Sequence, residues 1–168
     1  ARPELGEPVV EAAAAREHHD QLVVVVVMGR NAEVRGHHGA VHEEAALAAI
    51  KPLLQDPGVL KVGQNIKYDW LIFALRGIDT HPCDDTMLMS YAMHAGLHNH
   101  GMDFLSEKYL DHRPIGIKSL LGSGKAQVTF DKVAIDDAVK YAAEDADVTL
   151  RLWQAFKPKL HRVRVTTV

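Results

Sequence analysis

Tyr141 and Asp145 are the residues of this chain whose types and spacing point most directly to chemistry. They belong to the stretch 141–150 (YAAEDADVTL), which is rich in alanine and contains no Gly or Pro, so it predicts a helix. Residues four apart project from one face of a helix, so this phenol and this carboxylate can serve one reacting group. The alternative is a half-exposed helix in which Asp147 pairs with Arg151, and for a bare Tyr-x-x-x-Asp spacing that interpretation would be the better one.

A second polar group follows an apolar strand pattern at Val59–Val62. Gly63-Gln64-Asn65 predicts a tight exit from that strand into a helix, and Asn65 and Asp69 are again four apart. Open α/β sheets bind their ligands near the carboxyl ends of the strands, which is where these two side chains are expected. On an isolated helix, an exposed Asp69 would be unremarkable.

The surrounding elements predict an α/β domain in which strands and helices alternate. Leu22–Met28 is β-branched on both faces and predicts a strand covered on both sides. An amphipathic helix is expected from about residue 43 to 55, kinked by Pro52, and the helix after Asn65 is expected to stop at Gly77. The last helix is expected from about 136 to 156. Its apolar stripe, expected to be buried, consists of Val139, Ala142, Ala146, Leu150 and Trp153.

The other segments are shorter and less regular. Residues 1–21 fit a strand, a helix or a ragged terminus, and 29–35 suggest a turn followed by a short strand that completes a hairpin. Asp84–Thr86 precedes a helix, and Asp103 is expected to cap a further short helix. Residues 111–130 are expected to be an irregular loop.

Composition sets limits on function. The chain has 168 residues with a net charge of −3, which argues against coating of long duplex DNA through a basic stripe. No apolar run is long enough to span a bilayer, and the single Cys83 favours a reducing, cytoplasmic location. The pairs His18-His19 and His37-His38 lack a regular ligand spacing, so solvated histidines are favoured over a zinc site.

Taken together, these residues resemble the 3′-5′ exonuclease (proofreading) domain of bacterial family A DNA polymerase I, in the DEDD superfamily with the tyrosine form of the third motif. YAAEDADVTL at 141–150 resembles the third exonuclease motif, and GQNIKYD at 63–69 resembles the second. Further matches follow in the same order: Asp85–Leu88 with Ser90-Tyr91, His100 with Met102, Asp103 and Leu105, and Thr129-Phe130. The resemblance covers roughly residues 42–156.

The resemblance implies a ribonuclease H-like fold, with a mixed central sheet flanked by helices. It also implies removal of nucleotides from a 3′ end by two divalent cations, Mg²⁺ or Mn²⁺, about 4 Å apart. By the resemblance, Asp69 and Asp145 are the metal ligands and Tyr141 orients the attacking water. The implied substrate-binding residues are Gln64, Asn65, His100 and Phe130, the last by stacking on a base.

One departure concerns the family's first motif, Asp-x-Glu on the first strand, which has no counterpart before residue 42. If Val9–Glu11 is the remnant of that strand, Glu11 lies near the first acidic position as a candidate metal ligand, and Ala13 replaces the second carboxylate. Two alternatives are equally open: Glu11 is an ordinary surface residue, or the strand with the first motif lies upstream of this sequence. Asn99 also stands where the family usually has a basic residue.

Three functions follow from these observations. The first is a proofreading exonuclease domain acting on the single-stranded 3′ end of DNA, attached to a polymerase domain of the same or a longer chain, with weak or lost activity. The second is an inactive scaffold of the same fold, and the third is an RNA exonuclease similar to ribonuclease D. In each case residues 1–168 are expected to form one domain, with 161–168 as a linker or tail, and no membrane partner is expected.

Overall fold

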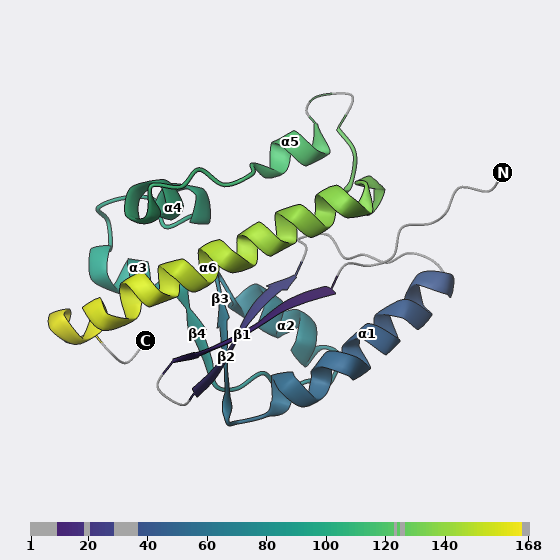
Figure 1. The fold of residues 1–168 in the computed structure, drawn as a ribbon, viewed down its shortest axis with the longest axis horizontal. Helices are drawn as coiled ribbons and strands as arrows, with labels where there is room; N and C mark the ends of the chain where they lie inside the picture. The colour runs from purple at the N-terminus through teal and green to yellow at the C-terminus, as the bar shows by residue number, and fades with distance from the viewer. Residues whose placement is uncertain (1–9, 19–20, 29–36, 123, 125–126, 166–168) are drawn as a thin grey trace.

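Four strands form a mixed sheet in the order β1-β2-β3-β4 in the computed structural model (Figure 1). The structure describes residues 10–18, 21–28, 37–122, 124 and 127–165. The strands are β1 (Val10–His18), β2 (Gln21–Met28), β3 (Val59–Gly63) and β4 (Cys83–Asp85). The helices are α1 (His37–Gln55), α2 (Lys67–Ala74), α3 (Thr86–His94), α4 (Met102–Leu110), α5 (Ile117–Leu121) and α6 (Ile135–Val163), with a 3₁₀ turn η2 (Phe130–Lys132).

The direction of the strands makes the sheet mixed. β1 pairs with β2 in antiparallel fashion, whereas β2 with β3 and β3 with β4 are parallel. Parallel neighbours need crossover connections, which α1 supplies between β2 and β3 and α2 supplies between β3 and β4. This arrangement is the ribonuclease H-like α/β fold that the resemblance implied.

β3 sends alternate residues to two separate cores. Leu60 and Val62 belong to a cluster with residues of α3, α4 and α6, whereas Val59 packs with Leu54 and Phe73 of α1 and α2. α1 and α2 therefore cover one face of the sheet, and α3, α4 and α6 the other. In Figure 1, α6 is the long helix that crosses the sheet, and α4 and α5 lie on the side of α6 that faces away from the strands.

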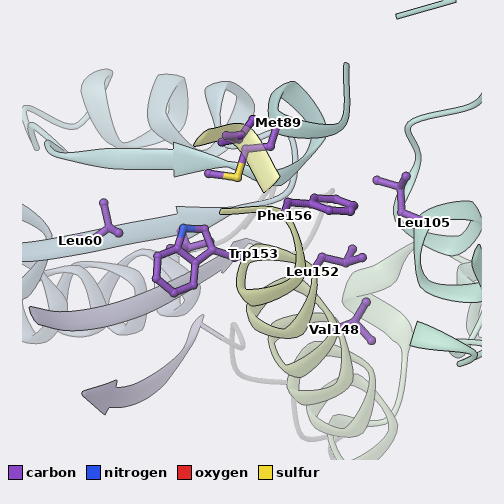
Figure 2. Packing of buried hydrophobic residues seen from close by; sticks show 9 residues of the cluster. Leu60, Met89, Leu105, Val148, Leu152, Trp153 and Phe156 are labelled. Carbon is purple, nitrogen blue, oxygen red and sulfur yellow. The ribbon is translucent and has the colours of Figure 1, made fainter. Parts of the chain in front are cut away.

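The larger core fixes the position of α6. Figure 2 shows Trp153 directed toward Leu60 of β3, while Leu152 and Phe156 point toward Leu105 of α4. Each such side chain contributes about 1.5–3 kcal/mol when fully buried. A hydrogen bond adds to this packing, because the Trp153 indole Nε1 donates to Asp84 Oδ2 of β4 at 2.7 Å. The register of α6 over the sheet is thereby set.

Lys61 is buried completely in the middle of β3. Its Nζ donates to the backbone carbonyls of Asp56, Val59 and His81 at 2.9, 2.9 and 2.6 Å. Burial lowers the pKa of this amine, and the three carbonyl oxygens replace the water that it loses. The lysine ties the start of β3 to the segments before β3 and β4.

Several element boundaries differ from those predicted. α1 begins at His37 instead of about 43, and α6 continues beyond Phe156 to Val163, so residues 161–163 are helical. The buried Leu160 explains the extension, because it packs in the same hydrophobic core as Leu152 and Phe156 of α6. Residues 10–18, which the sequence left open, form β1, while the predicted hairpin at 29–35 lies outside the described residues.

Other corrections concern local features. β4 was not predicted, because a three-residue strand gives no periodic signal. α5 and η2 interrupt the expected loop 111–130. Asp103 lies in the first turn of α4, whose cap position is Gly101, so the predicted cap was wrong by two residues. α2 ends at Ala74, ahead of Gly77, which has a positive φ of 68°. Among the described helices, none has both the length and the apolar character needed to cross a membrane.

Candidate active site

Asp145 lies on the buried face of α6, with 8% of its surface exposed. This differs from the predicted stripe, because Val139 is exposed whereas Asp145 is buried beside Ala146 and Val148. α6 is covered both by the sheet and by α4, so its buried face is broader than an apolar pattern suggests. A buried carboxylate is costly unless its surroundings compensate its charge.

The other two acidic residues of this stretch, Glu144 and Asp147, form contacts nearer the surface of the protein. Glu144 accepts from the backbone N–H of Ile115 at 2.6 Å and lies 3.0 Å from Nε2 of His112. It therefore ties the segment before α5 to α6. Asp147 pairs with Arg151 at 3.4 Å on the exposed side, as expected for an ordinary helix surface. Of the three acids in the motif, Asp145 is the buried one.

Tyr141 is half-buried one turn before Asp145, and its ring lies against that of Phe130. The two ring centroids are 6.2 Å apart at an interplanar angle of 62°. Such an edge-to-face contact is typical of stabilising aromatic pairs. η2 thus brings Phe130 next to Tyr141, the tyrosine of the third motif.

The turn after β3 presents the second motif. Gly63 has no room for a side chain, because an added Cβ would lie 2.8 Å from Cβ of Ile66. Asn65 has a φ of 61°, in the left-handed region that Asn tolerates better than most residues. Asp69 follows in the first turn of α2 and is 8% exposed.

Asp85 holds this turn in place. Its Oδ1 accepts from the backbone N–H groups of Asn65 at 2.9 Å, Met87 at 2.8 Å and Leu88 at 3.3 Å. Its Oδ2 accepts from the backbone N–H of Ile66 at 3.1 Å. One buried carboxylate therefore caps α3 and also satisfies two donors of the turn before α2.

Thr86 and Gln64 complete the support. The Thr86 hydroxyl lies 3.1 Å from the Gly63 carbonyl and 2.6 Å from Oε1 of Gln64, while Nε2 of Gln64 donates to the carbonyl of His100 at 2.9 Å. Nδ1 of His100 is 2.9 Å from the Ser90 hydroxyl. Burial, and then the neighbouring His98, lowers the pKa of His100. The structure therefore brings Gln64 and His100 together, and the side chain of Gln64 is engaged on both sides.

The segment from His100 to Met102 also links the two motifs. Gln64, at the end of β3, binds the carbonyl of His100, and the Thr149 hydroxyl on α6 lies 3.6 Å from the sulfur of Met102. Thr149 is one turn after Asp145 on α6, and Gln64 is five residues before Asp69, in the link between β3 and α2. Therefore α6, which carries Asp145, and the link that leads to Asp69 both contact this short segment.

Glu11 can be placed only through its backbone register in β1. Its Cα pairs with Val27 of β2, and Val25 pairs with Val62 of β3, so Glu11 lies level with the residue that follows Gly63. It is at the carboxyl edge of the sheet, two strand spacings or about 10 Å from β3.

The donors of this site suit a hard cation only in part. Asp69 and Asp145 offer carboxylate oxygens, and Mg²⁺ is commonly held by one or two carboxylates together with substrate phosphates and water. Within the described residues, no group of three or more His, Cys, Asp or Glu side chains could hold a metal ion.

Comparison with known proteins defines the class. Residues 11–161 match the family model described as 3′-5′ exonuclease. The chain is 58% identical over 123 residues to DNA polymerase I of Rhizobium leguminosarum, and 48% identical over 127 residues to DNA polymerase I of Pseudomonas aeruginosa. These matches cover 73% and 71% of this chain. The chain belongs to the 3′-5′ exonuclease family, in the form found in bacterial DNA polymerase I.

Solved structures agree on the fold. Brucella melitensis NrnC bound to pGG has a TM-score of 0.57 at 19% identity, over 87% of this chain and 68% of that chain. NrnC with bound Mg²⁺ has a TM-score of 0.55 at 23% identity, over 68% of this chain and 52% of that chain. Pol1 of M. smegmatis, in complex with DNA primer-template and dNTP, has a TM-score of 0.53 at 19% identity, over 85% and 21% of the two chains. The present chain spans only 12% and 14% of the two polymerases named above.

Sequence reasoning missed the roles of Asp85 and Thr86. Both were noted as matches to a family, but their contacts join residues about 20 positions apart in the chain. The available signal was an Asp-Thr pair just before a helix, which is typical of an N-cap. That signal predicts the cap of α3 but not the contact with the turn before α2.

Proposed function

We propose that this chain is the 3′-5′ exonuclease-type domain of a DNA polymerase I and acts on the single-stranded 3′ end of DNA. The observation that carries the proposal is the shared contact of β3 and α6 with the segment from His100 to Met102. This segment lies beside two motifs, and the acid of each, Asp69 and Asp145, is buried with 8% of its surface exposed. Membership in the exonuclease family supports the same assignment.

In the proposed reaction, Asp69 and Asp145 would hold divalent cations, Mg²⁺ or Mn²⁺, with Glu11 as a candidate third ligand. Such cations would supply an activated water and charge stabilisation of the leaving oxygen. Tyr141 orients the water through its neutral hydroxyl. Phe130, which lies against Tyr141, stacks on the terminal base, and Asn65 and His100 contact the terminal nucleotides.

We further propose that the activity is weak or lost. Two divalent cations a few ångströms apart repel strongly, and each needs several oxygen ligands in place of water. The family's first motif supplies an Asp and a Glu, whereas this chain has no Asp-x-Glu before residue 42. This departure favours a second candidate function, an inactive scaffold that packs against a polymerase domain.

One experiment separates these functions. The purified chain is incubated with single-stranded DNA, and separately with RNA of the same sequence, in millimolar Mg²⁺ or Mn²⁺. Asp145→Ala and Glu11→Ala are tested in parallel. Slow shortening of DNA from the 3′ end, abolished by Asp145→Ala, supports the exonuclease. Preferential degradation of RNA would instead support the enzyme similar to ribonuclease D.

The remaining outcomes are equally informative. No degradation of either strand, with a folded protein, supports the scaffold. Degradation that survives Asp145→Ala indicates a contaminating nuclease. Rapid degradation that depends on both Asp145 and Glu11 would contradict the proposal of weak activity and assign Glu11 to the metal site.

A further inference from the structure

A strip of cations and aromatic rings lies beside the candidate active site, where α3, α4 and the C-terminal half of α6 come together. We call it the His98 strip. It consists of His94, His98, Phe104, Lys108, Tyr109 and Lys159. These residues come from three helices and the loop after α3, so the tertiary structure assembles the strip. Figure 1 shows α3 and α4 along this part of α6.

Two lysines converge on one ring of the strip. Nζ of Lys108 lies 5.5 Å from the centroid of Tyr109, and Nζ of Lys159 lies 5.0 Å from the same centroid. In the described part of the chain neither lysine forms an ion pair, whereas Lys157 pairs with Asp84 nearby. Two exposed ammonium groups beside one ring create a local positive potential that attracts an anion.

Glu107, the acidic residue next to Lys108 in the sequence, does not fully cancel the positive potential of the two lysines. Glu107, next to Lys108 on α4, lies 3.6 Å from Nε of Arg113 and is shared with that cation. Asp103 is exposed in the first turn of α4, at the opposite end from Lys108. Burial, followed by His98, Lys108 and Lys159, lowers the pKa of His94. The histidine therefore adds a neutral ring at pH 7, while the lysines supply the charge.

Aromatic contacts join the strip to the candidate active site. The rings of His98 and His100 have centroids 4.9 Å apart, and His98 also contacts Phe104 at 5.1 Å. His100 in turn accepts from Gln64 at the end of β3. Lys159 is 14 residues after Asp145 on α6, which corresponds to about 21 Å along the helix axis. At 3.4 Å per nucleotide this distance spans about six nucleotides.

We propose that the His98 strip binds the single nucleic-acid strand upstream of the 3′ end that occupies the candidate active site. Lys108 and Lys159 bind backbone phosphates, and the exposed face of Phe104 stacks on a base. Alternating cations and rings are the usual basis of sequence-tolerant binding to single strands. An acidic protein surface would use the lysines but has no need of the rings, so the strip favours nucleic acid. The inference rests on the proposed function for the direction of the strand.

The test compares oligodeoxythymidines of 3 and 12 nucleotides, labelled with fluorescein at the 5′ end. Binding is measured by anisotropy in EDTA, so that no metal-dependent hydrolysis consumes the probe. The variant is Lys108→Ala/Lys159→Ala, and the control Lys51→Ala/Arg76→Ala removes two charges from the opposite side of the sheet. Thermal unfolding verifies that both variants are folded.

Loss of two phosphate contacts should make the negative slope of log K (the association constant) against log salt concentration less steep by about 1.4. It should also weaken 12-mer binding about tenfold at 0.15 M salt. Binding of the 3-mer and binding by the control variant should not change. Equal affinity of the wild type and the double variant for the 12-mer would overturn the inference. Lysine-dependent binding of polyglutamate as tight as that of the 12-mer would also overturn it, in favour of an acidic protein partner.

The outcome can be distinguished from failure of the proposed function. If the 12-mer binds through the lysines but DNA is never shortened in Mg²⁺ or Mn²⁺, the strip stands and the nuclease activity fails. If DNA is shortened and the double variant binds and degrades the 12-mer like the wild type, the nuclease stands and the strip fails. If the wild type binds neither oligonucleotide in EDTA and shortens no DNA in Mg²⁺ or Mn²⁺, both are contradicted.

Discussion

The carboxylate of Asp85 accepts the backbone N–H of Asn65 at 2.9 Å and so joins the start of α3 to the turn that carries the second motif. Asn65 has a left-handed backbone conformation, which is costly for residues other than glycine unless the surroundings hold it. Asp85 supplies that support with a buried charge, and charge-assisted hydrogen bonds are stronger than neutral ones. The placement of Asn65 and Asp69 therefore depends on a residue outside both motifs.

The first prediction concerns Asp85→Ser. Serine retains the capability to cap α3 but is too short to reach Asn65 and Ile66, so one buried and one partly buried donor lose their acceptor. We expect the free energy of unfolding to fall by about 2–3 kcal/mol. Amide hydrogen exchange should accelerate at Asn65 and Ile66 more than at Met87 and Leu88. Equal acceleration at all four amides would show that Asp85 acts only as a helix cap, and Asp103→Ser is the control on the first turn of α4.

The second prediction concerns Gly63→Ala. The new Cβ would lie 2.8 Å from Ile66, so the turn must shift or the isoleucine must move, at a cost of about 1–3 kcal/mol. Gly116→Ala is the matched control, because no atom lies within 4 Å of the added Cβ. Urea unfolding measures both. If overpacking is the cause, Ile66→Ala in the Gly63→Ala background should cost less than it does in the wild type.

The third prediction concerns Tyr141→Phe, which retains the ring contact with Phe130 but removes the hydroxyl. Any DNA degradation that depends on Asp145 should slow by a factor of about 10² to 10⁴, because a positioning or proton-transfer group contributes rates of that order. Thermal stability and binding of the unhydrolysed strand should remain unchanged. A rate equal to that of the wild type would remove Tyr141 from the reaction.

The fourth prediction concerns pH. His94 and His100 have lowered pKa values in the folded chain, first because of burial and then because of His98, with Lys108 and Lys159 adding to the effect at His94. The unfolded chain then binds protons more readily, so stability is greatest above about pH 6.5 and falls as the pH drops below that value. Urea unfolding at pH 7.5, 6.5 and 5.5 measures this decline.

His94→Gln should make that decline shallower without abolishing it, because His100 contributes in the same direction. His161→Gln removes an exposed histidine from the end of α6 and serves as the control. A decline that is as steep in His94→Gln as in the wild type would show that other groups cause the loss of stability in acid.

The sequence by itself determined the family and the residues of the two motifs. Tyr141 and Asp145 were assigned to one helix from alanine content and four-residue spacing, and Gly63 and Asn65 were assigned to a strand exit. These features are local, because helix periodicity and the conformational freedom of Gly and Asn act over a few residues. The family resemblance extended them to a ribonuclease H-like fold, which the described residues confirm.

Only the tertiary structure decided which face of α6 is buried, how far that helix extends and what holds the second motif. Asp145 and Leu160 are buried because the sheet and α4 cover α6 from two sides, a covering that no helical pattern contains. Asp85 binds Asn65 across 20 residues, and the His98 strip joins three helices. Such contacts depend on how the elements pack against one another, so the spacing of residues along the chain does not predict them.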